Sequence, residues 1–178
     1  MTRGAGGGTD PVTAAGAAYC WGYGRWGQRG DGSTIPTQTA PVAVIGGHTF
    51  TSLSAGGDYF NAAPIFVLDD AHVCGVDASG AAWCWGSNRW GELGRGTTSA
   101  LSSTPGLVTG APSLVAVSAG SYHNCGLTAA GEAWCWGYNA NGQLGRPSST
   151  LNYSAVALLV PGSLRFTSIV LGDSHSCG

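Results

Sequence analysis

Lysine is absent from this sequence of 178 residues, and charged side chains make up only 9% of it. The seven basic residues are all arginines, scattered from Arg3 to Arg165, and the formal net charge is −2. Binding of nucleic acid through a basic face requires clustered Lys and Arg side chains. The composition therefore argues against a nucleic-acid partner.

Long apolar runs are also missing. No window holds 18 consecutive apolar residues or a sustained amphipathic helical pattern, so we expect no membrane span. Residues 1–8 contain no apolar core of the kind that a secretory signal peptide needs. Residues 1–15 are rich in Gly and Ala, and we expect them to form a flexible N-terminal segment.

The sequence lacks a recognisable catalytic set. It contains no G-x-S-x-G motif and no pair of carboxylates at catalytic spacing. The chain has four histidines, His48, His72, His123 and His175, and most of them recur with an internal repeat. We therefore expect a protein that is not an enzyme and needs no cofactor.

Two arrangements could hold a metal ion, and we favour neither. His72 and Cys74 would share one face of a strand, as would His123 and Cys125, but no fourth ligand recurs with them and no CxxC knuckle is present. We expect these histidines instead to hydrogen-bond the backbone of the preceding loop. A set of carboxylates could bind Ca²⁺ but is more typical of a solvated loop: Asp58, Asp69 and Asp70.

Glycine is abundant, with 31 residues, and much of it lies in one aromatic stretch that occurs three times, at residues 19–30, 82–94 and 134–145. Cys84 and Cys135 are 51 residues apart, whereas Cys20 and Cys84 are 64 apart. The 13 extra residues lie between Gly56 and His72, near positions 57–71. A fixed period of this size indicates a repeat architecture in which neighbouring units complete one another's core.

Each unit has the content of a propeller blade. Short runs of alternating pattern predict strands at 17–21, 42–45, 50–56, 72–76, 81–85, 107–108, 114–120, 123–127, 132–136 and 166–172. We expect an all-β propeller of about three four-stranded blades, either partial or completed by oligomerisation. Its units are a closing strand and loop at 16–30, a blade with the insertion at 31–94, a blade at 95–145 and an incomplete blade at 146–178.

The hairpins place cysteines opposite each other. A turn centred on Ser79 sets Cys74 against Cys84, and the turn at residues 128–131 does the same for Cys125 and Cys135. Directly opposed residues of an antiparallel pair are close enough for a disulfide. Paired cysteines favour an oxidising compartment, although reduced, buried thiols remain the alternative. On this basis we expect a processed or partial product of an exported protein, located outside the cell or on its surface.

The repeated loops, of the form W-G-x-N-x-x-G-Q-L-G, and the H-x-C-G-[LV] hairpins resemble the regulator of chromosome condensation repeat family. The resemblance covers nearly all of residues 17–178 and implies a β-propeller, in this family usually of seven blades. The first loop departs from the pattern, with Gly24 in place of Asn and Arg29 in place of Leu, so we expect it to be distorted or to lie at an interface. Paired hairpin cysteines are similar to those of exported bacterial members of the family.

These features favour a module for binding or structure rather than catalysis. An enlarged loop on a propeller rim is a natural contact point, and the insertion supplies apolar anchors at Tyr59, Phe60, Ile65 and Phe66. The alternative is an insertion that packs back on its own blade. The rim would also present Tyr122 and Ser174. The resemblance implies two further functions, secreted inhibition of an enzyme and guanine-nucleotide exchange on a small GTPase.

The two ends of the chain look complementary. Residues 166–178 supply the first part of a blade, and residues 12–21 supply the turn and strand that such a blade lacks. Cys177 and Cys20 therefore have no partner within their own hairpins. We expect two chains to pair head to tail with Cys177 of each facing Cys20 of the other, unless further repeats outside this sequence complete the ring.

Overall fold

The computed structural model describes residues 12–58 and 70–178. These ranges contain strands and turns and no helix, so the all-β prediction is confirmed for them. The strands are β1 (Tyr19–Tyr23), β2 (Thr37–Ala43), β3 (Phe50–Asp58), β4 (Asp70–Asp77), β5 (Ala82–Ser87), β6 (Leu101–Leu107), β7 (Ala116–Ala119), β8 (His123–Leu127), β9 (Ala133–Tyr138), β10 (Tyr153–Leu159), β11 (Val170–Leu171) and β12 (Ser176–Cys177). The described part of the chain thus offers no helical segment that could cross a membrane.

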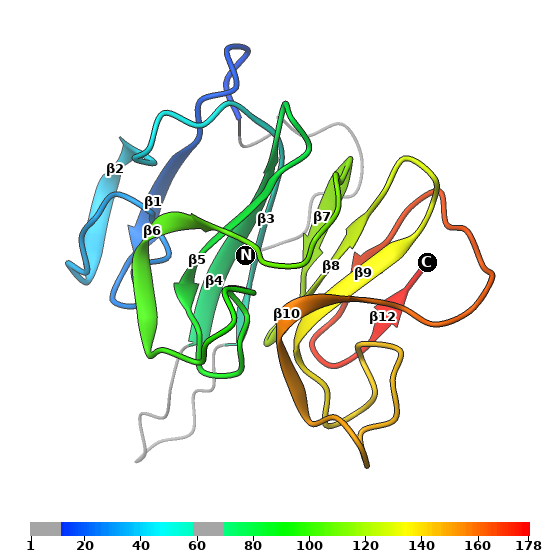
Figure 1. Cartoon of the computed structure of the whole chain (residues 1–178). Helices are drawn as coiled ribbons and strands as arrows, with labels where there is room; N and C mark the ends of the chain where they lie inside the picture. The colour runs from blue at the N-terminus through cyan, green and yellow to red at the C-terminus, as the bar shows by residue number, and fades with distance from the viewer. Residues whose placement is uncertain (1–11, 59–69) are drawn as a thin grey trace.

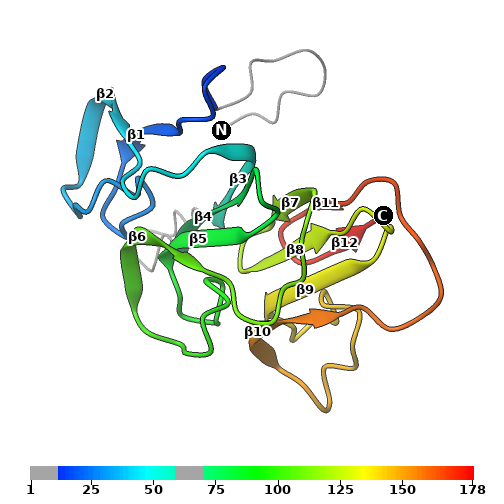
Figure 2. The same ribbon diagram turned by 45° about the horizontal axis from the view of Figure 1, so that its top comes forward.

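The strands form two complete propeller blades between two half-blades. The first blade is the antiparallel sheet β3-β4-β5-β6, and the second is the sheet β7-β8-β9-β10. Strands β1 and β2 form a two-stranded N-terminal pair, and β11 and β12 form a C-terminal pair. The blades stand side by side, with one pair at each end of the arc (Figures 1 and 2). The predicted partial propeller is therefore the observed architecture.

Serine side chains join the innermost strands of the arc. Ser54 on β3 accepts a hydrogen bond from the backbone N–H of Ala119 on β7 (3.0 Å). Ser118, at the equivalent position of β7, accepts one from Leu171 on β11 (3.2 Å). Because the two bonds are equivalent, each inner strand is attached to the next in the same way.

The outermost strands differ from the sequence prediction. Strand β2 begins at Thr37, before the strand expected at 42–45, and β6 begins at Leu101 and ends at Leu107, so it mostly precedes the strand expected at 107–108. Both strands contain a proline, Pro41 in β2 and Pro105 in β6. A proline has no N–H to donate, but an outer strand is paired on one side only and tolerates it. Exposure of these strands also removes the apolar pattern that marks a buried strand.

The hydrophobic cores lie between blades rather than within them. One core joins Val76 and Cys84 of the first blade to Val117 and Trp136 of the second. Another joins Cys135 of the second blade to Leu171 of the C-terminal pair. Two leucines of the long loops, Leu93 and Leu144, are buried in these two cores. Neighbouring units therefore do complete one another, as the period indicated.

Both hairpin cysteine pairs are bonded. Cys74 lies opposite Cys84 with a Cα–Cα distance of 4.1 Å, and Cys125 lies opposite Cys135 at the same distance. All four residues are buried. In the chain-entropy model, closing such a short loop stabilises the protein by about 2.5 to 3 kcal/mol. The thiolates that the weighed zinc arrangement would need are therefore engaged in disulfides.

The first loop is not distorted, so that one of the two alternatives expected for it is wrong. Gly27 donates to Gly24 O and Gly30 donates to Gly27 O, both at 2.9 Å, as the matching glycines do in the other two loops. Arg29 is 2% exposed and folds back into the loop, where its guanidinium donates to Ile35 O (2.7 Å) and pairs with Asp31 (3.1 Å). A Cβ at Gly24 would collide with that guanidinium. The two departures from the repeat therefore compensate each other, since one arginine takes the place of the missing asparagine side chain.

This compensation predicts a non-additive pair of substitutions. Gly24→Asn should destabilise the protein by about 2 to 4 kcal/mol, because the new side chain overlaps the buried guanidinium. Arg29→Leu should also destabilise it, because loop carbonyls lose their donor. The double variant restores the Asn and Leu of the other loops and should recover at least half of the summed loss, measured by urea unfolding. Additive losses would contradict the compensation.

Candidate functional site

The turns β3–β4, β7–β8 and β11–β12 and the long loops that follow β5 and β9 gather at one end of the strands, here called the loop face. This end is the lower side of Figure 1. Within the described residues, β3 and β4 pair as far as Asp58 and Asp70, and this pair lies at the loop face. Side chains on this face come from both blades and form the candidate site.

Asparagine side chains hold the long loops in shape. Asn88 accepts a hydrogen bond from the backbone N–H of Leu93, and Asn139 accepts one from Leu144, both at 2.9 Å. Their amide groups donate to carbonyls further along the same loops, at Thr97 (2.9 Å) and Leu151 (2.6 Å). Both asparagines are fully buried. The loops are thus rigid supports for the residues that they expose.

A polar bridge connects the blades beneath this face. His72 of the first blade contacts the side-chain oxygen of Asn124 in the second (2.8 Å). The Asn124 amide donates in turn to Glu92 O in the loop of the first blade (2.9 Å). The same carbonyl accepts the indole N–H of Trp136 at 2.9 Å. One buried carbonyl therefore receives two donors from the neighbouring blade.

The next junction repeats the bridge with a serine. His123 contacts the Ser176 hydroxyl (3.0 Å), and that hydroxyl donates to Gln143 O (2.7 Å). The prediction that repeat histidines bond the backbone of the preceding loop is therefore wrong, because their partners are side chains of the following unit. Burial lowers the pKa of His72 and of His123 to about 4, so both rings are neutral at physiological pH.

Glu92 is the unusual member of these loops. Its Oε2 accepts the backbone N–H of Trp90 (2.7 Å), as Gln143 does for Asn141 and Gln28 for Trp26, both at 2.9 Å. Glu92 is fully buried, and burial raises its pKa to about 7, with a further upward contribution from the charge of Asp70. A carboxyl group therefore occupies a position at which the other two loops carry a neutral amide.

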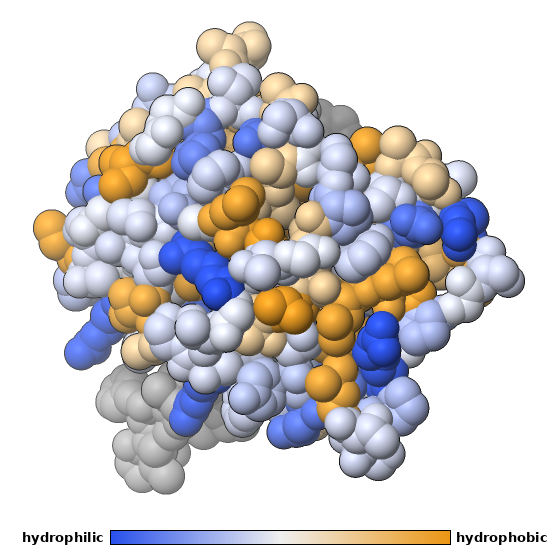
Figure 3. All heavy atoms as spheres, in the orientation of Figure 1, coloured by the Kyte–Doolittle hydropathy of each residue, from blue (hydrophilic) through white to orange (hydrophobic). Residues whose placement is uncertain are grey.

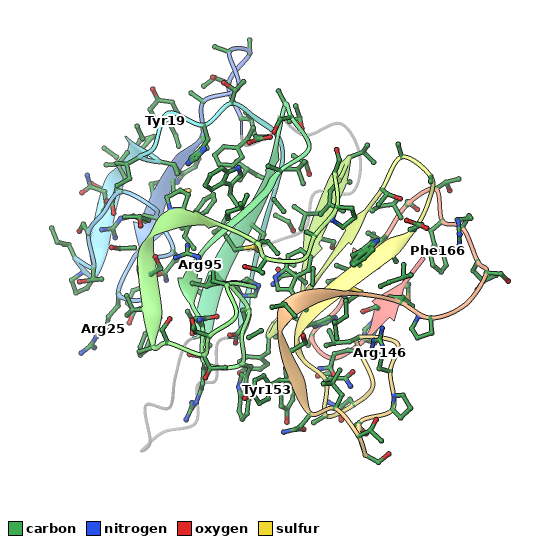
Figure 4. All side chains as sticks on the ribbon, in the orientation of Figure 1. Tyr19, Arg25, Arg95, Arg146, Tyr153 and Phe166 are labelled. Atoms are coloured by element: carbon green, nitrogen blue, oxygen red, sulfur yellow. A yellow bond between two sulfur atoms is a disulfide. The ribbon has the colours of Figure 1, made fainter. Side chains whose placement is uncertain are left out.

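Four aromatic side chains form a surface across the two blades on the loop face. The rings of Trp90 and Tyr138 have centroids 4.7 Å apart, and Tyr122 lies edge-on to Tyr138 at 6.3 Å. Tyr153 is the cross-strand partner of Tyr138 and is 43% exposed (Figure 4). Aromatic pairs at these separations are mutually stabilising and present a firm apolar surface. We call this set, Trp90, Tyr122, Tyr138 and Tyr153, the aromatic surface.

Charged groups border the aromatic surface near the start of β4. Arg89, which precedes Trp90, is half-exposed, and its guanidinium lies 3.9 Å from the carboxylate of Asp70. Asp70 is buried and also accepts a hydrogen bond from Ser87 (3.0 Å). Figure 3 shows that polar and apolar groups alternate over the molecule, with an apolar band over β10.

The structure separates the residues that the sequence predicted for the rim. Tyr122 belongs to the aromatic surface, whereas Ser174 is exposed in the β11–β12 turn and lines a cavity at the end of the arc. Tyr59, Phe60, Ile65 and Phe66 lie outside the described residues, as does Asp69. Within residues 12–58 and 70–178, no group of three or more His, Cys, Asp or Glu side chains is arranged to hold a metal ion.

Sequence reasoning missed Trp90, Tyr138 and Tyr153. A signal for the first two was present in the alignment of the loops. Positions that hold the loop, such as Asn88 and Gly91, match Asn139 and Gly142, whereas Trp90 corresponds to Asn141. Residues at positions that vary between otherwise matched loops do not hold the loop in shape, so they are available to contact a partner.

The polar bridge predicts a specific loss of stability. Asn124→Val, which copies Val73 at the equivalent position, leaves His72 and one lone pair of Glu92 O without partners in a buried site. We expect a cost of about 2 to 3 kcal/mol in urea unfolding. Asn124→Ser, which copies Ser176, keeps a hydroxyl that can serve both groups and should cost about 1 kcal/mol or less. Equal costs for the two variants would show that the bridge contributes nothing.

The raised pKa of Glu92 predicts a pH-dependent gain on substitution. The folded state holds this proton up to about pH 7 and the unfolded state only to about 4.5, so its contribution to stability is lost as pH rises through that window. Glu92→Gln should therefore stabilise the protein by about 1 to 3 kcal/mol more at pH 8 than at pH 5. His72 and His123 titrate in both proteins, so the difference between the two proteins isolates Glu92. If the free energy of unfolding differed between Glu92→Gln and the parent by the same amount at pH 5 and pH 8, the raised pKa of Glu92 would be contradicted.

Comparison with known proteins agrees with this geometry. Models of the Regulator of chromosome condensation (RCC1) repeat match residues 79–127, 130–178 and 114–143. The human E3 ubiquitin-protein ligase HERC2 is 32% identical over 138 residues, which is 75% of this chain and 3% of HERC2. The chain thus spans a small part of that relative.

Solved structures show the same fold. Yeast RCC1 (Prp20) bound to Kap60 superposes with a TM-score of 0.75 at 17% identity, covering 93% of this chain and 38% of Prp20. Prp20p from Saccharomyces cerevisiae, studied with its binding to Gsp1p and histones, gives 0.67 at 17%, covering 85% and 36%. With matched loops, inter-blade cores and family models over more than half of its length, this chain belongs to the RCC1 repeat family of β-propellers.

Proposed function

We propose that this chain is a non-enzymatic propeller module that binds a protein partner through the aromatic surface of the loop face, outside the cell or on its surface. The observation that carries the proposal is the cluster of Trp90, Tyr122, Tyr138 and Tyr153, none of which is fully buried. Trp and Tyr are the side chains that most often dominate protein–protein binding energy.

The cluster is held in place before any partner arrives. Backbone N–H groups of Trp90 and Tyr138 are bonded to Glu92 Oε2 (2.7 Å) and to Tyr122 O (2.8 Å). The asparagine-braced loops below them add further rigidity. Binding to a rigid surface loses little conformational entropy, so more of the contact energy is available for affinity. Arg89 at the border adds a cation suited to an acidic group on the partner.

Two disulfides support the proposed location. Both pairs are buried in inter-blade cores, where they add stability that only an oxidising environment maintains. The small number of charged residues distributed over the chain, with a net charge of −2, supports a protein rather than a nucleic-acid partner.

Enzyme inhibition and regulation of a small GTPase are narrower versions of this function. Each requires the same property, a rigid propeller face that engages a folded protein. The yeast propeller Prp20p, which shares this fold, binds Gsp1p and histones. Identification of the partner would therefore choose between the two narrower functions.

A photo-crosslinking amino acid at position 153 tests the proposal, with position 164 as the control. Tyr153 belongs to the aromatic surface, and Leu164 is 72% exposed and does not. Introduced into the full chain in its producing cells, the probe at 153 should give a discrete protein adduct that the probe at 164 does not. Mass spectrometry of the adduct then names the partner.

With the purified partner, Trp90→Ala and Tyr138→Ala should each raise Kd at least about tenfold, whereas Leu164→Ala should change it less than about twofold. An enzyme as partner would indicate inhibition, and a guanine-nucleotide-binding protein would indicate exchange activity. Unchanged Kd values for both aromatic variants would overturn the proposal.

A further inference from the structure

Glu92 connects the junction between the two blades to the aromatic surface. Its backbone carbonyl accepts hydrogen bonds from the Asn124 amide and the Trp136 indole, both at 2.9 Å, so this carbonyl is fixed to the second blade. Its carboxyl oxygen Oε2 accepts the backbone N–H of Trp90 at 2.7 Å. The Trp90 ring lies against that of Tyr138, with 4.7 Å between their centroids. The Glu92 carboxyl group therefore holds the loop tip that presents Trp90.

The surroundings of this carboxyl group suit its neutral form. The side chain is 0% exposed, and its second oxygen, Oε1, has no hydrogen-bond partner among the described residues. A buried charge without a partner costs far more free energy than a neutral polar group does. Gln28 and Gln143 occupy the matching positions of the other two loops and make the same bond with an amide, which carries no charge. Glu92 thus introduces a proton-binding group where the other loops have none.

Two charged side chains act on Glu92 from different elements. Asp70, at the start of β4, is buried, and its negative charge opposes a second negative charge on Glu92. Arg89 of the same loop favours that charge, but its guanidinium is half-exposed and lies 3.9 Å from the Asp70 carboxylate. Burial raises the pKa of Glu92 to about 7, and Asp70 adds to the rise. An ionised Glu92 is therefore poorly compensated where it lies.

The other side chains of this junction do not titrate near neutral pH. Asn124 of β8 and Trp136 of β9 carry no charge. Burial lowers the pKa of His72, on β4, and of His123, on β8, to about 4, so both rings are neutral from pH 5 upward. Among the described residues of the junction, the charge that changes near neutral pH is thus that of Glu92.

The loop tip that carries Trp90 is held by longer hydrogen bonds than the tips of the other two loops. Its turn bond, from the Gly91 N–H to Asn88 O, is 3.3 Å long, whereas the equivalent bonds of the first and third loops are both 2.9 Å. The backbone N of Asn88 lies 3.3 Å from Ala100 O, and the equivalent bonds of the other loops measure 3.0 and 2.8 Å. Bonds of this length are weaker than bonds near 2.9 Å. Residues 89–91 are therefore the part of the loop that yields most easily.

We propose that Glu92 makes the aromatic surface pH-dependent. With its carboxyl group neutral, the tip is closed and Trp90 packs on Tyr138, whereas ionisation moves residues 89–91 outward, hydrates the carboxylate and separates the two rings. The proton passes to solvent and returns from it, so the step needs no other reactant. The consequence for binding rests on the proposed function: the partner binds more tightly in mildly acidic than in alkaline solution.

Proton linkage sets the sign and the upper limit of the effect. In the closed tip, burial keeps the pKa of Glu92 at about 7, whereas in an open and hydrated tip this pKa returns to its ordinary value of 4.5. The closed tip is therefore favoured below this window and the open tip above it. Raising the pH through the window changes the ratio of open to closed tips by at most about 300-fold. The affinity for the partner falls in proportion to the closed fraction.

Fluorine NMR of the full chain labelled with fluorotryptophan tests the closure without any partner, once the Trp90 resonance has been assigned by its loss in Trp90→Phe. Between pH 5 and pH 8 this resonance should shift or divide, with a midpoint above 4.5 and not beyond about 7. Glu92→Gln, which copies the first and third loops, should keep the resonance at its acidic position throughout. Because the four histidines are present in both proteins, the difference between them isolates Glu92.

Two charge variants check the direction of the titration. Asp70→Asn removes a repulsion and should lower the midpoint, whereas Arg89→Gln removes an attraction and should raise it, each by about half a pH unit or more. Arg165→Gln is the matched control, because Arg165 is also half-exposed and pairs with a carboxylate away from this loop, that of Glu132 (3.6 Å). It should leave the midpoint unchanged. With the purified partner, Kd of the parent should rise from pH 5 to pH 8 at least about fivefold more than Kd of Glu92→Gln.

Three outcomes would overturn this proposal. They are a Trp90 resonance that stays constant from pH 5 to pH 8, a resonance that changes equally in Glu92→Gln, and a partner Kd that rises equally in the parent and in that variant. A failure of the proposed function is distinguishable from these, because it consists of unchanged Kd values for Trp90→Ala and Tyr138→Ala and leaves the pH response of the resonance intact.

Discussion

Each unit of this protein is finished by a side chain from the next one. A tryptophan from the third strand of a blade donates its indole N–H to a carbonyl in the loop of the preceding unit and closes the core between them. A sheet of four short strands cannot bury its own faces, so the apolar clusters form at the junctions. The last glycines of the first two loops, Gly30 and Gly94, follow from the same contact, because a side chain there would collide with the indole.

The polar groups at the junctions between units also find their partners in the neighbouring unit. Carbonyl oxygens of the loops are withdrawn from water when the blades meet. Asn124 donates to Glu92 O and Ser176 donates to Gln143 O from the neighbouring unit. The histidines complete these bridges in their neutral form, since burial makes protonation unfavourable. Glu92 differs from these neutral groups, because a carboxylate at that position has to be protonated or remain buried with its charge.

The residues that hold the loops in shape and the residues proposed for binding lie at different positions of the same loops. The bracing residues Asn88 and Asn139 match between the loops of the two complete blades, whereas Trp90 corresponds to Asn141 and meets Tyr138 of the next blade. A binding surface is thereby assembled from two units that are 51 residues apart in sequence. The arginines Arg95 and Arg146 (Figure 4) serve the scaffold instead, since they reach across each blade to carbonyls of Thr104 (2.9 Å) and Leu159 (2.7 Å).

The sequence by itself determined the repeat, the all-β class, the hairpins and the facing of Cys74 with Cys84, because these depend on spacing and on local turn geometry. It did not determine the outer strands, where exposure removes the apolar pattern, or the partners of His72 and His123, which lie about 50 residues away in the next unit. The tertiary structure decided two features that no periodicity relates. The Arg29 side chain fills the space above Gly24, and four aromatic rings meet on one face, because packing alone brings these residues together.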